Sequence, residues 1–90
     1  MLRSFPTGAF KRDVKRAERR GKDLAKLRRL LSSLINQTSL PERYRDHPLK
    51  GKWAGCRDAH VEPDWLLIYQ IDGDQLILLR TGTHADLFDE

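Results

Sequence analysis

Residues 65–81 have the sequence WLLIYQIDGDQLILLRT, which is typical of a β-hairpin. Two apolar runs, 65–71 and 75–81, are separated by a turn that contains Asp72-Gly73, a dipeptide typical of tight β-hairpins. The first run is apolar at every position from Trp65 to Tyr69, as is typical of a strand buried on both faces. These residues therefore predict a central hairpin against which the rest of the chain packs.

A third strand-like run precedes the hairpin at residues 53–61, and the two are joined by a proline-containing turn at residues 62–64, where proline interrupts pairing. The three runs together predict an antiparallel meander. Residues 39–52 contain two prolines and a glycine and are predicted to form a loop with room for a short extended piece. A further short strand is predicted at residues 2–5.

Two helices are predicted before the loop. Thr7 is a suitable N-cap for a helix over residues 8–20, which has an apolar stripe of Phe10, Val14 and Ala17. Gly21 suits the left-handed position that ends a helix, and a second helix follows at residues 23–36 with a leucine-rich stripe. We interpret that stripe as core rather than as a zipper for a partner helix. The predicted fold is a single α+β domain over residues 1–90, an antiparallel helical hairpin packed on one face of a small antiparallel sheet.

Composition favours a soluble protein that acts inside the cell. Charged residues make up 33% and hydrophobic residues 39% of the chain, which is typical of a globular domain with a charged surface. No run of about 18 apolar residues occurs, so a membrane span is excluded, and the first residues lack the apolar region of a secretory signal. The single cysteine, Cys56, cannot form an internal disulfide and is interpreted as a packing residue within a strand. We expect a cytoplasmic location and no membrane partner.

The charge is divided unequally along the chain. Residues 1–50 carry fourteen Lys and Arg against five Asp and Glu, a net charge of +9, whereas residues 51–90 carry three against eight, a net charge of −5. The first predicted helix carries a group of basic residues outside its apolar stripe, namely Lys11, Arg12, Lys15, Arg16, Arg19 and Arg20. This pattern indicates a polyanionic partner, nucleic acid first, with a solvated helix face as the alternative.

Polar side chains are expected to converge at one end of the meander. Because the chain reverses at each turn, the turn at residues 62–64 and the end of the third strand lie at the same end of the sheet. His60 and Asp64 flank that turn and His84 follows the third strand, so these side chains are expected to meet. The same edge also receives Trp65, Arg80 and Phe88. His47 precedes the first strand by a loop, and topology does not place it.

This set of residues suits the cleavage of a phosphodiester. Two histidines on opposite sides of a scissile phosphate can act as base and acid, a carboxylate can fix a tautomer, and arginine and aromatic rings can bind phosphate and base. Each residue also has a structural interpretation: Trp65 as core, Arg80 as the partner of Asp58 or Asp86, and Asp64 as a turn cap. A zinc site of three histidines is an alternative, although the spacings of 13 and 24 residues lack the short pairs common in such sites.

Three segments resemble the YafQ branch of the RelE-type toxins, which are the toxin halves of type II toxin–antitoxin pairs. They are residues 46–49 (DHPL), 57–65 (RDAHVEPDW) and 80–88 (RTGTHADLF), and the resemblance extends over about residues 8 to 88. It implies a ribosome-dependent, metal-independent endoribonuclease without a cofactor. In this reaction the 2′-hydroxyl of the mRNA attacks the adjacent phosphate and leaves a 2′,3′-cyclic phosphate and a 5′-hydroxyl.

Matching positions imply an active-site set of His47, His60, Asp64, Trp65, His84 and Phe88. Within it we favour His84 as general acid, and His60 or His47, oriented with Asp64, as base or phosphate stabiliser. Arg80 is expected to contact the substrate, and the basic residues of the first helix are expected to contact ribosomal RNA.

The resemblance also implies an acidic cognate antitoxin, a DinJ-like ribbon-helix-helix protein, through which alone the toxin would reach operator DNA. Two alternatives are a gyrase-targeting toxin of the same fold and a non-catalytic nucleic-acid-binding module. Neither of these needs the three histidines.

Overall fold

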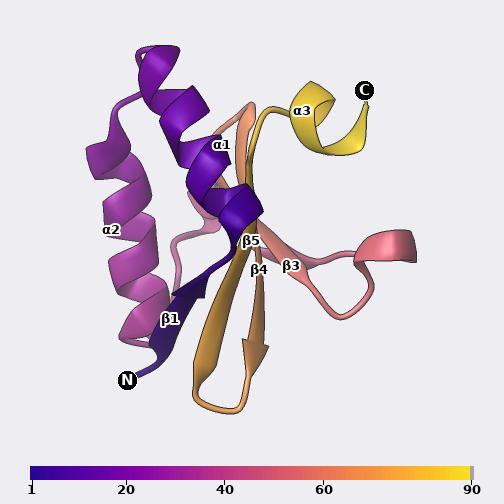
Figure 1. Cartoon of the computed structure of the whole chain (residues 1–90). Helices are drawn as coiled ribbons and strands as arrows, with labels where there is room; N and C mark the ends of the chain where they lie inside the picture. The colour runs from indigo at the N-terminus through magenta and orange to yellow at the C-terminus, as the bar shows by residue number, and fades with distance from the viewer. Residues whose placement is uncertain (90) are drawn as a thin grey trace.

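The β4–β5 hairpin lies at the centre of the sheet, as the sequence predicts. In the computed structural model, which describes residues 1–89, β4 (Trp65–Asp72) and β5 (Gln75–Gly82) pair in antiparallel fashion around a two-residue turn. Gly73 in this turn has a φ of 61°, a conformation that glycine adopts without steric cost. The complete sheet has five strands in the order β1-β5-β4-β3-β2 (Figure 1).

Two helices cover one face of the sheet, α1 (Gly8–Arg19) and α2 (Leu24–Ile35), and both end within one residue of their predicted bounds. Thr7 accepts a hydrogen bond from the main-chain N–H of Phe10, as expected of an N-cap. Between the helices Gly21 has a φ of 80°, the left-handed conformation predicted for it. The apolar stripes of both helices join one core with alternate residues of the central strands, including Leu27, Leu30, Leu34, Trp65, Leu67 and Tyr69. The α+β fold class is confirmed.

The predicted N-terminal strand exists as β1 (Arg3–Pro6), but it pairs with β5 in parallel. The sheet is therefore mixed rather than wholly antiparallel. The hydroxyl of Thr7 donates to the carbonyl oxygen of Leu79, and its main-chain N–H donates to that of Leu78, so the chain passes from the strand directly into α1.

The first strand of the meander is shorter than predicted. It is β3 (Arg57–Glu62), because Trp53 belongs to a short 3-10 helix, η2 (Gly51–Trp53), and Gly55 has a φ of 88° that is incompatible with a strand. Cys56 accordingly lies before β3 rather than within it, although it is buried. The predicted loop contains another 3-10 helix, η1 (Glu42–Tyr44), and the extended piece β2 (His47–Pro48), which pairs with β3.

The second face of the sheet carries a smaller apolar cluster and the C-terminal helix α3 (His84–Phe88). Leu66 and Ile68 of β4 belong to this cluster, while their neighbours Trp65 and Leu67 belong to the helix-covered core. This division explains why β4 is apolar at consecutive positions. Because side chains alternate along a strand, the same face receives Asp58 and His60 of β3.

None of the helices in residues 1–89 combines the length and apolar character that a bilayer span requires.

Candidate active site

Four aromatic rings form a row across the sheet face that α1 and α2 leave uncovered. The ring centroids of His47 and His60 are 6.1 Å apart, those of His60 and His84 are 5.8 Å apart, and those of His84 and Phe88 are 6.4 Å apart. The structure therefore brings His60, His84 and Phe88 together, as topology predicts. It also brings His47, which topology did not place, because β2 pairs His47 with Asp58 of β3. We call these four residues the histidine row.

His84 is held at its end of the row by Asp64. Oδ1 of Asp64 lies 2.9 Å from the main-chain nitrogen of His84 and 2.6 Å from Nδ1 of its ring, and both nitrogens donate to it. These two bonds, the main-chain one first, lower the pKa of Asp64. The carboxylate thus fixes the proton on Nδ1 and leaves Nε2 of His84 to face a substrate. The predicted partnership of Asp64 with His60 or His47 is wrong, since Asp64 orients His84.

The short helix α3 is anchored to α1 through Asp86. Thr83 and Asp86 form a reciprocal capping box at the start of α3. Asp86 also lies 2.7 Å from Nη1 of Arg20 and 3.6 Å from Nη2 of Arg16, and its interaction with Arg20, followed by smaller contributions, strongly lowers its pKa. The two arginines therefore fix the helix that carries His84.

His47 is oriented by the backbone. Its Nδ1 lies 2.7 Å from the carbonyl oxygen of Arg45 and 3.0 Å from Oδ1 of Asp58. Because a carbonyl oxygen can only accept, Nδ1 carries the proton and donates it there. In the neutral ring Nε2 of His47 is then the free basic nitrogen, as a general base requires.

Asp58 is a further candidate site residue, which the sequence analysis considered only as a partner for Arg80. It is 3% exposed, and burial raises its pKa, against the opposing effect of His47, His60 and His84. Its Oδ1 and Nδ1 of His60 are both buried without a hydrogen-bond partner within residues 1–89. The signal that could have found it is the two-residue spacing from His60, which places both side chains on one face of a strand.

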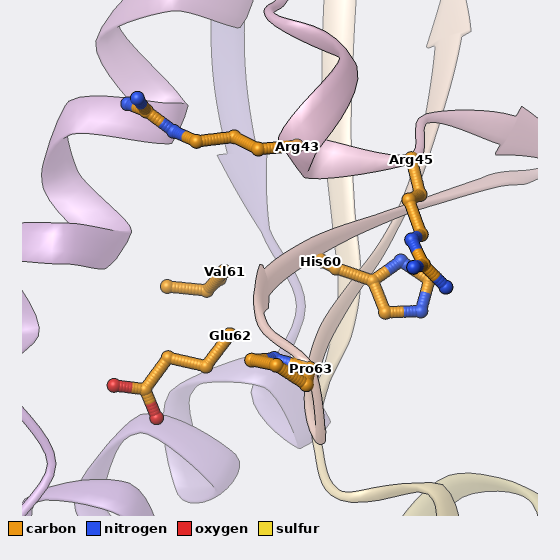
Figure 2. A pocket seen from close by; sticks show the side chains of 6 residues that line it. All are labelled: Arg43, Arg45, His60, Val61, Glu62 and Pro63. Carbon is orange, nitrogen blue, oxygen red and sulfur yellow. The ribbon is translucent and has the colours of Figure 1, made fainter.

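A cleft of about 390 Å³ adjoins the row at the end of β3 (Figure 2). Its lining consists of Arg43, Arg45, His60, Val61, Glu62 and Pro63. His60 is thus accessible from this side. Among the described residues, no three His, Cys, Asp or Glu side chains are grouped so as to hold a metal ion.

Trp65 and Arg80 lie outside the row. Trp65 is 1% exposed, and its indole N–H donates to Thr81 in the helix-side core, so its ring offers no face to a base. Arg80 binds the buried carboxylate of Asp13 on α1 through Nε at 2.6 Å and Nη2 at 3.1 Å, rather than Asp58 or Asp86. We therefore remove both from the substrate-binding set.

The basic residues of α1 and its end form two groups. Arg16 and Arg20 are engaged with Asp86, and Arg16 also with Asp13. The other four form no ion pair with a carboxylate within residues 1–89, and they are Lys11, Arg12, Lys15 and Arg19.

Known proteins share this fold and sequence pattern. The profile of the family described as "Bacterial toxin of type II toxin-antitoxin system, YafQ" matches residues 2–89. The chain is 55% identical over 83 residues to the mRNA interferase toxin YafQ of Escherichia coli K12, which covers 91% of this chain and 90% of that protein.

Two solved structures extend the likeness to three dimensions. The crystal structure of YafQ from E. coli BL21(DE3) has a TM-score of 0.93 and 50% identity, with 98% of this chain and 99% of that chain covered. A chain of the E. coli DinJ-YafQ complex has a TM-score of 0.90 at 50% identity, with the same coverage. The protein therefore belongs to the YafQ family of bacterial toxins of type II toxin–antitoxin systems.

Proposed function

We propose that this toxin is an mRNA interferase, a ribosome-dependent endoribonuclease that stops translation by cutting mRNA in the decoding site without a metal ion. The observation that carries the proposal is the histidine row with the Asp64–His84 pair at one end. Its relative in E. coli K12 bears the name mRNA interferase toxin, which supports the same reaction class here. An mRNA target implies action in the cytoplasm.

The order of the rings suggests the roles of the three histidines. Phosphoryl transfer needs the attacking and leaving oxygens roughly in line, with base and acid at opposite ends. His47 and His84 flank His60, with ring separations of 6.1 and 5.8 Å. His47 is therefore assigned as base, His84 as acid, and His60 as the group that binds the phosphate between them.

Nε2 of His47 takes the proton of the RNA 2′-hydroxyl, and the 2′-oxygen forms a bond to phosphorus. The bond from phosphorus to the 5′-oxygen of the next nucleotide breaks, and that oxygen receives a proton from Nε2 of His84, which acts in its doubly protonated form and keeps its Nδ1–H hydrogen bond to Asp64. The products are a 2′,3′-cyclic phosphate and a 5′-hydroxyl. Phe88, which extends the row beyond His84, offers an aromatic edge for a base next to the cut.

Partners follow from the family and from surface charge. The E. coli DinJ-YafQ complex supports a cognate antitoxin for this toxin, acidic and of the ribbon-helix-helix class, through which it would reach operator DNA. The cations of α1 that form no ion pair within residues 1–89 suit ribosomal RNA, whose backbone phosphates bind lysine and arginine with little sequence demand; they are Lys11, Arg12, Lys15 and Arg19.

A message with one 2′-deoxynucleotide immediately 5′ of the scissile phosphate tests the chemistry. If the 2′-hydroxyl is the nucleophile, the toxin should bind to ribosomes programmed with this message but should not cleave it. The all-ribose message should be cut to a 2′,3′-cyclic phosphate and a 5′-hydroxyl. A metal-bound hydroxide would need no such group and would typically leave a 3′-hydroxyl and a 5′-phosphate. Efficient cleavage of the 2′-deoxy message would falsify internal attack and the roles assigned to the histidines.

A further inference from the structure

The edge of β3 beyond β2 is flanked by η1 instead of by another strand. β2 pairs with β3 only at Arg57 and Asp58, so residues 59–62 have no strand partner on that side within residues 1–89. The cleft that contains His60 lies along this part of the edge. In Figure 2 the side chains of Arg45 and His60 extend to one side of β3, whereas Arg43 extends to the other side, toward α2.

A second cavity continues the cleft toward α2. It has a volume of about 310 Å³ and is lined by Lys26, Arg29, Arg43, Tyr44 and Val61. Arg43 and Val61 also line the first cleft, so the two hollows adjoin. We call them together the β3-edge groove, which runs from His60 around the edge of the sheet to α2.

The β3-edge groove carries uncompensated positive charge. Arg29, Arg43 and Arg45 form no ion pair with a carboxylate among residues 1–89. Glu62, the one acidic residue in the lining of the two hollows, is neutralised by Lys22 at 3.0 Å and Lys26 at 2.8 Å.

Two contacts preorganise the arginines that line the cleft of His60. The guanidinium of Arg43 lies 4.9 Å from the ring centre of Tyr44, and its Nη2 lies 3.3 Å from the Tyr44 hydroxyl. The backbone of Arg45 is left-handed, with a φ of 46°, and its carbonyl accepts the Nδ1 proton of His47. Arg45 thus contacts one histidine through its backbone and shares the cleft of another through its side chain.

We propose that the β3-edge groove binds the mRNA strand on one side of the scissile phosphate, with Arg45 and Arg43 each holding a backbone phosphate. This inference rests on the proposed function, because the strand is the one whose phosphate lies against His60. An RNA chain leaving His60 along the β3-edge groove meets two planar forks of donors suited to phosphate oxygens, and Val61 and Pro63 supply apolar surface to a ribose or base. An acidic antitoxin segment would meet the same charges, but the shared cleft with His60 favours the substrate.

The test separates substrate from ribosome. Arg43→Gln and Arg45→Gln, singly and combined, are compared with Arg3→Gln, which removes the same charge from β1 at the opposite edge of the sheet. Toxin binding is measured to vacant ribosomes and to ribosomes programmed with the uncleavable 2′-deoxy message. The message should strengthen binding of the wild type and of Arg3→Gln. The double variant should bind programmed ribosomes about ten- to a hundredfold more weakly, with a log–log salt slope lower by about 0.7 for each phosphate that it no longer neutralises.

Vacant ribosomes should bind every variant equally. If the double variant loses affinity equally for vacant and programmed ribosomes, the groove contacts ribosomal RNA. If it loses affinity for neither, the groove does not bind RNA. Both results overturn the inference. If the message adds nothing to wild-type binding, the proposed function itself fails, which is a separate outcome.

A second arm identifies the phosphates. Uncharged methylphosphonate linkages are placed in turn at three positions on either side of the scissile phosphate. At one position the uncharged linkage should weaken binding of the wild-type toxin to the level of Arg45→Gln. Binding of Arg45→Gln itself should not be weakened further by that linkage. If the losses of affinity caused by the linkage and by Arg45→Gln are additive at every position, Arg45 does not contact a message phosphate directly.

Discussion

The three histidines differ in what their Nδ1 atoms contact, and this difference supports the roles proposed for them. Nδ1 of His47 donates to a carbonyl oxygen, that of His84 donates to a carboxylate, and that of His60 has no hydrogen-bond partner within residues 1–89. Both rings have a carboxylate oxygen near Nδ1, that of Asp58 at 3.0 Å from His47 and that of Asp64 at 2.6 Å from His84, but only Asp64 accepts a hydrogen bond from the ring beside it. This direct bond favours His84 as the proton donor of the proposed reaction.

The first prediction concerns His84. His84→Ala should lower the rate of message cleavage on ribosomes by about 10²–10⁴-fold, the range of general acid catalysis, and should abolish growth arrest when the toxin is produced without antitoxin. The fold should remain, because the side chain is 37% exposed and lies outside both apolar clusters. Circular dichroism and thermal unfolding check the fold, and a folded variant with full toxicity contradicts the acid assignment.

The second prediction concerns Asp58, whose pKa is raised by burial. The native protein then holds this proton to a higher pH than the unfolded chain does, so stability falls as pH rises from the unfolded pKa of about 3.9 through the native value. Asp58→Asn should therefore be more stable than the wild type at pH 7.5 in urea unfolding, and the gain should shrink as pH falls toward 4.

Cleavage by Asp58→Asn should nevertheless decrease, because His47 no longer has a charged neighbour. Asp74→Asn, which removes a carboxylate from the exposed β4–β5 turn, is the matched control and should change neither property. A variant that is less stable at every pH would mean that the Asp58 carboxylate supports the fold rather than the chemistry.

Some of these residues could be predicted and others could not. His60, Asp64 and His84 follow from strand alternation and chain reversal, which are local rules. Asp58 obeys the same alternation as His60, so its two-residue spacing from His60 could have placed it on the same face. The pairing of Arg80 with Asp13 joins residues 67 positions apart, and no local pattern indicates it.

At the scale of elements, the position of α3 depends on one glycine. A Cβ at Gly82 would lie 2.9 Å from Oδ2 of Asp86 and 3.0 Å from Nη2 of Arg16, the two groups that anchor the helix carrying His84. Both distances are shorter than van der Waals contact allows. A side chain at this position must therefore displace Asp86 or Arg16.

The third prediction is that Gly82→Ala disturbs the site more than the fold. The overpacking should cost about 1–3 kcal/mol of unfolding free energy, and a displacement of His84 by about 1 Å should lower cleavage about 10²-fold. Gly8→Ala is the control, since its Cβ would meet Arg12 at an ordinary 3.5 Å. Unchanged cleavage by Gly82→Ala would show that α3 tolerates the shift.

Elements with a local signal were predicted well, whereas those set by tertiary pairing were not. The caps and apolar stripes of α1 and α2 and the Asp72-Gly73 turn lie within a few residues of one another in sequence. The start of β3 depends instead on the left-handed backbone at Gly55, and the parallel pairing of β1 depends on β5, more than 70 positions away. A short edge strand of four residues carries no sign of its partner or direction.

At the scale of the whole molecule, the basic first half and the acidic second half are partly joined to each other. Arg16 and Arg20 bind Asp86, and Lys22 and Lys26 bind Glu62. These pairs hold the helical layer against the ends of the sheet and the site. Among residues 1–89, two groups of cations without an ion pair are left for a polyanion, those of α1 and the arginines of the β3-edge groove, besides separate residues such as Arg28 and Lys52.

The fourth prediction separates the cations of α1 that are free to bind RNA from those that are paired with Asp86. Replacing its unpaired cations in Lys11→Gln, Arg12→Gln, Lys15→Gln and Arg19→Gln should weaken binding to vacant ribosomes and lower the log–log salt slope by about 0.7–0.9 for each phosphate that is no longer neutralised. The melting temperature should stay close to that of the wild type, because these side chains form no ion pair in residues 1–89.

Arg16→Gln with Arg20→Gln should show the opposite pattern. Asp86 is left without its cationic partners, so the melting temperature and the cleavage rate should fall as α3 loosens, while the salt slope on vacant ribosomes should change little. The two sets remove charge from the same helix and its end, so a general effect of net charge would lower the slope in proportion to the number of cations removed. That proportional result would mean that ribosome binding depends on total charge and not on the face that the fold leaves unpaired.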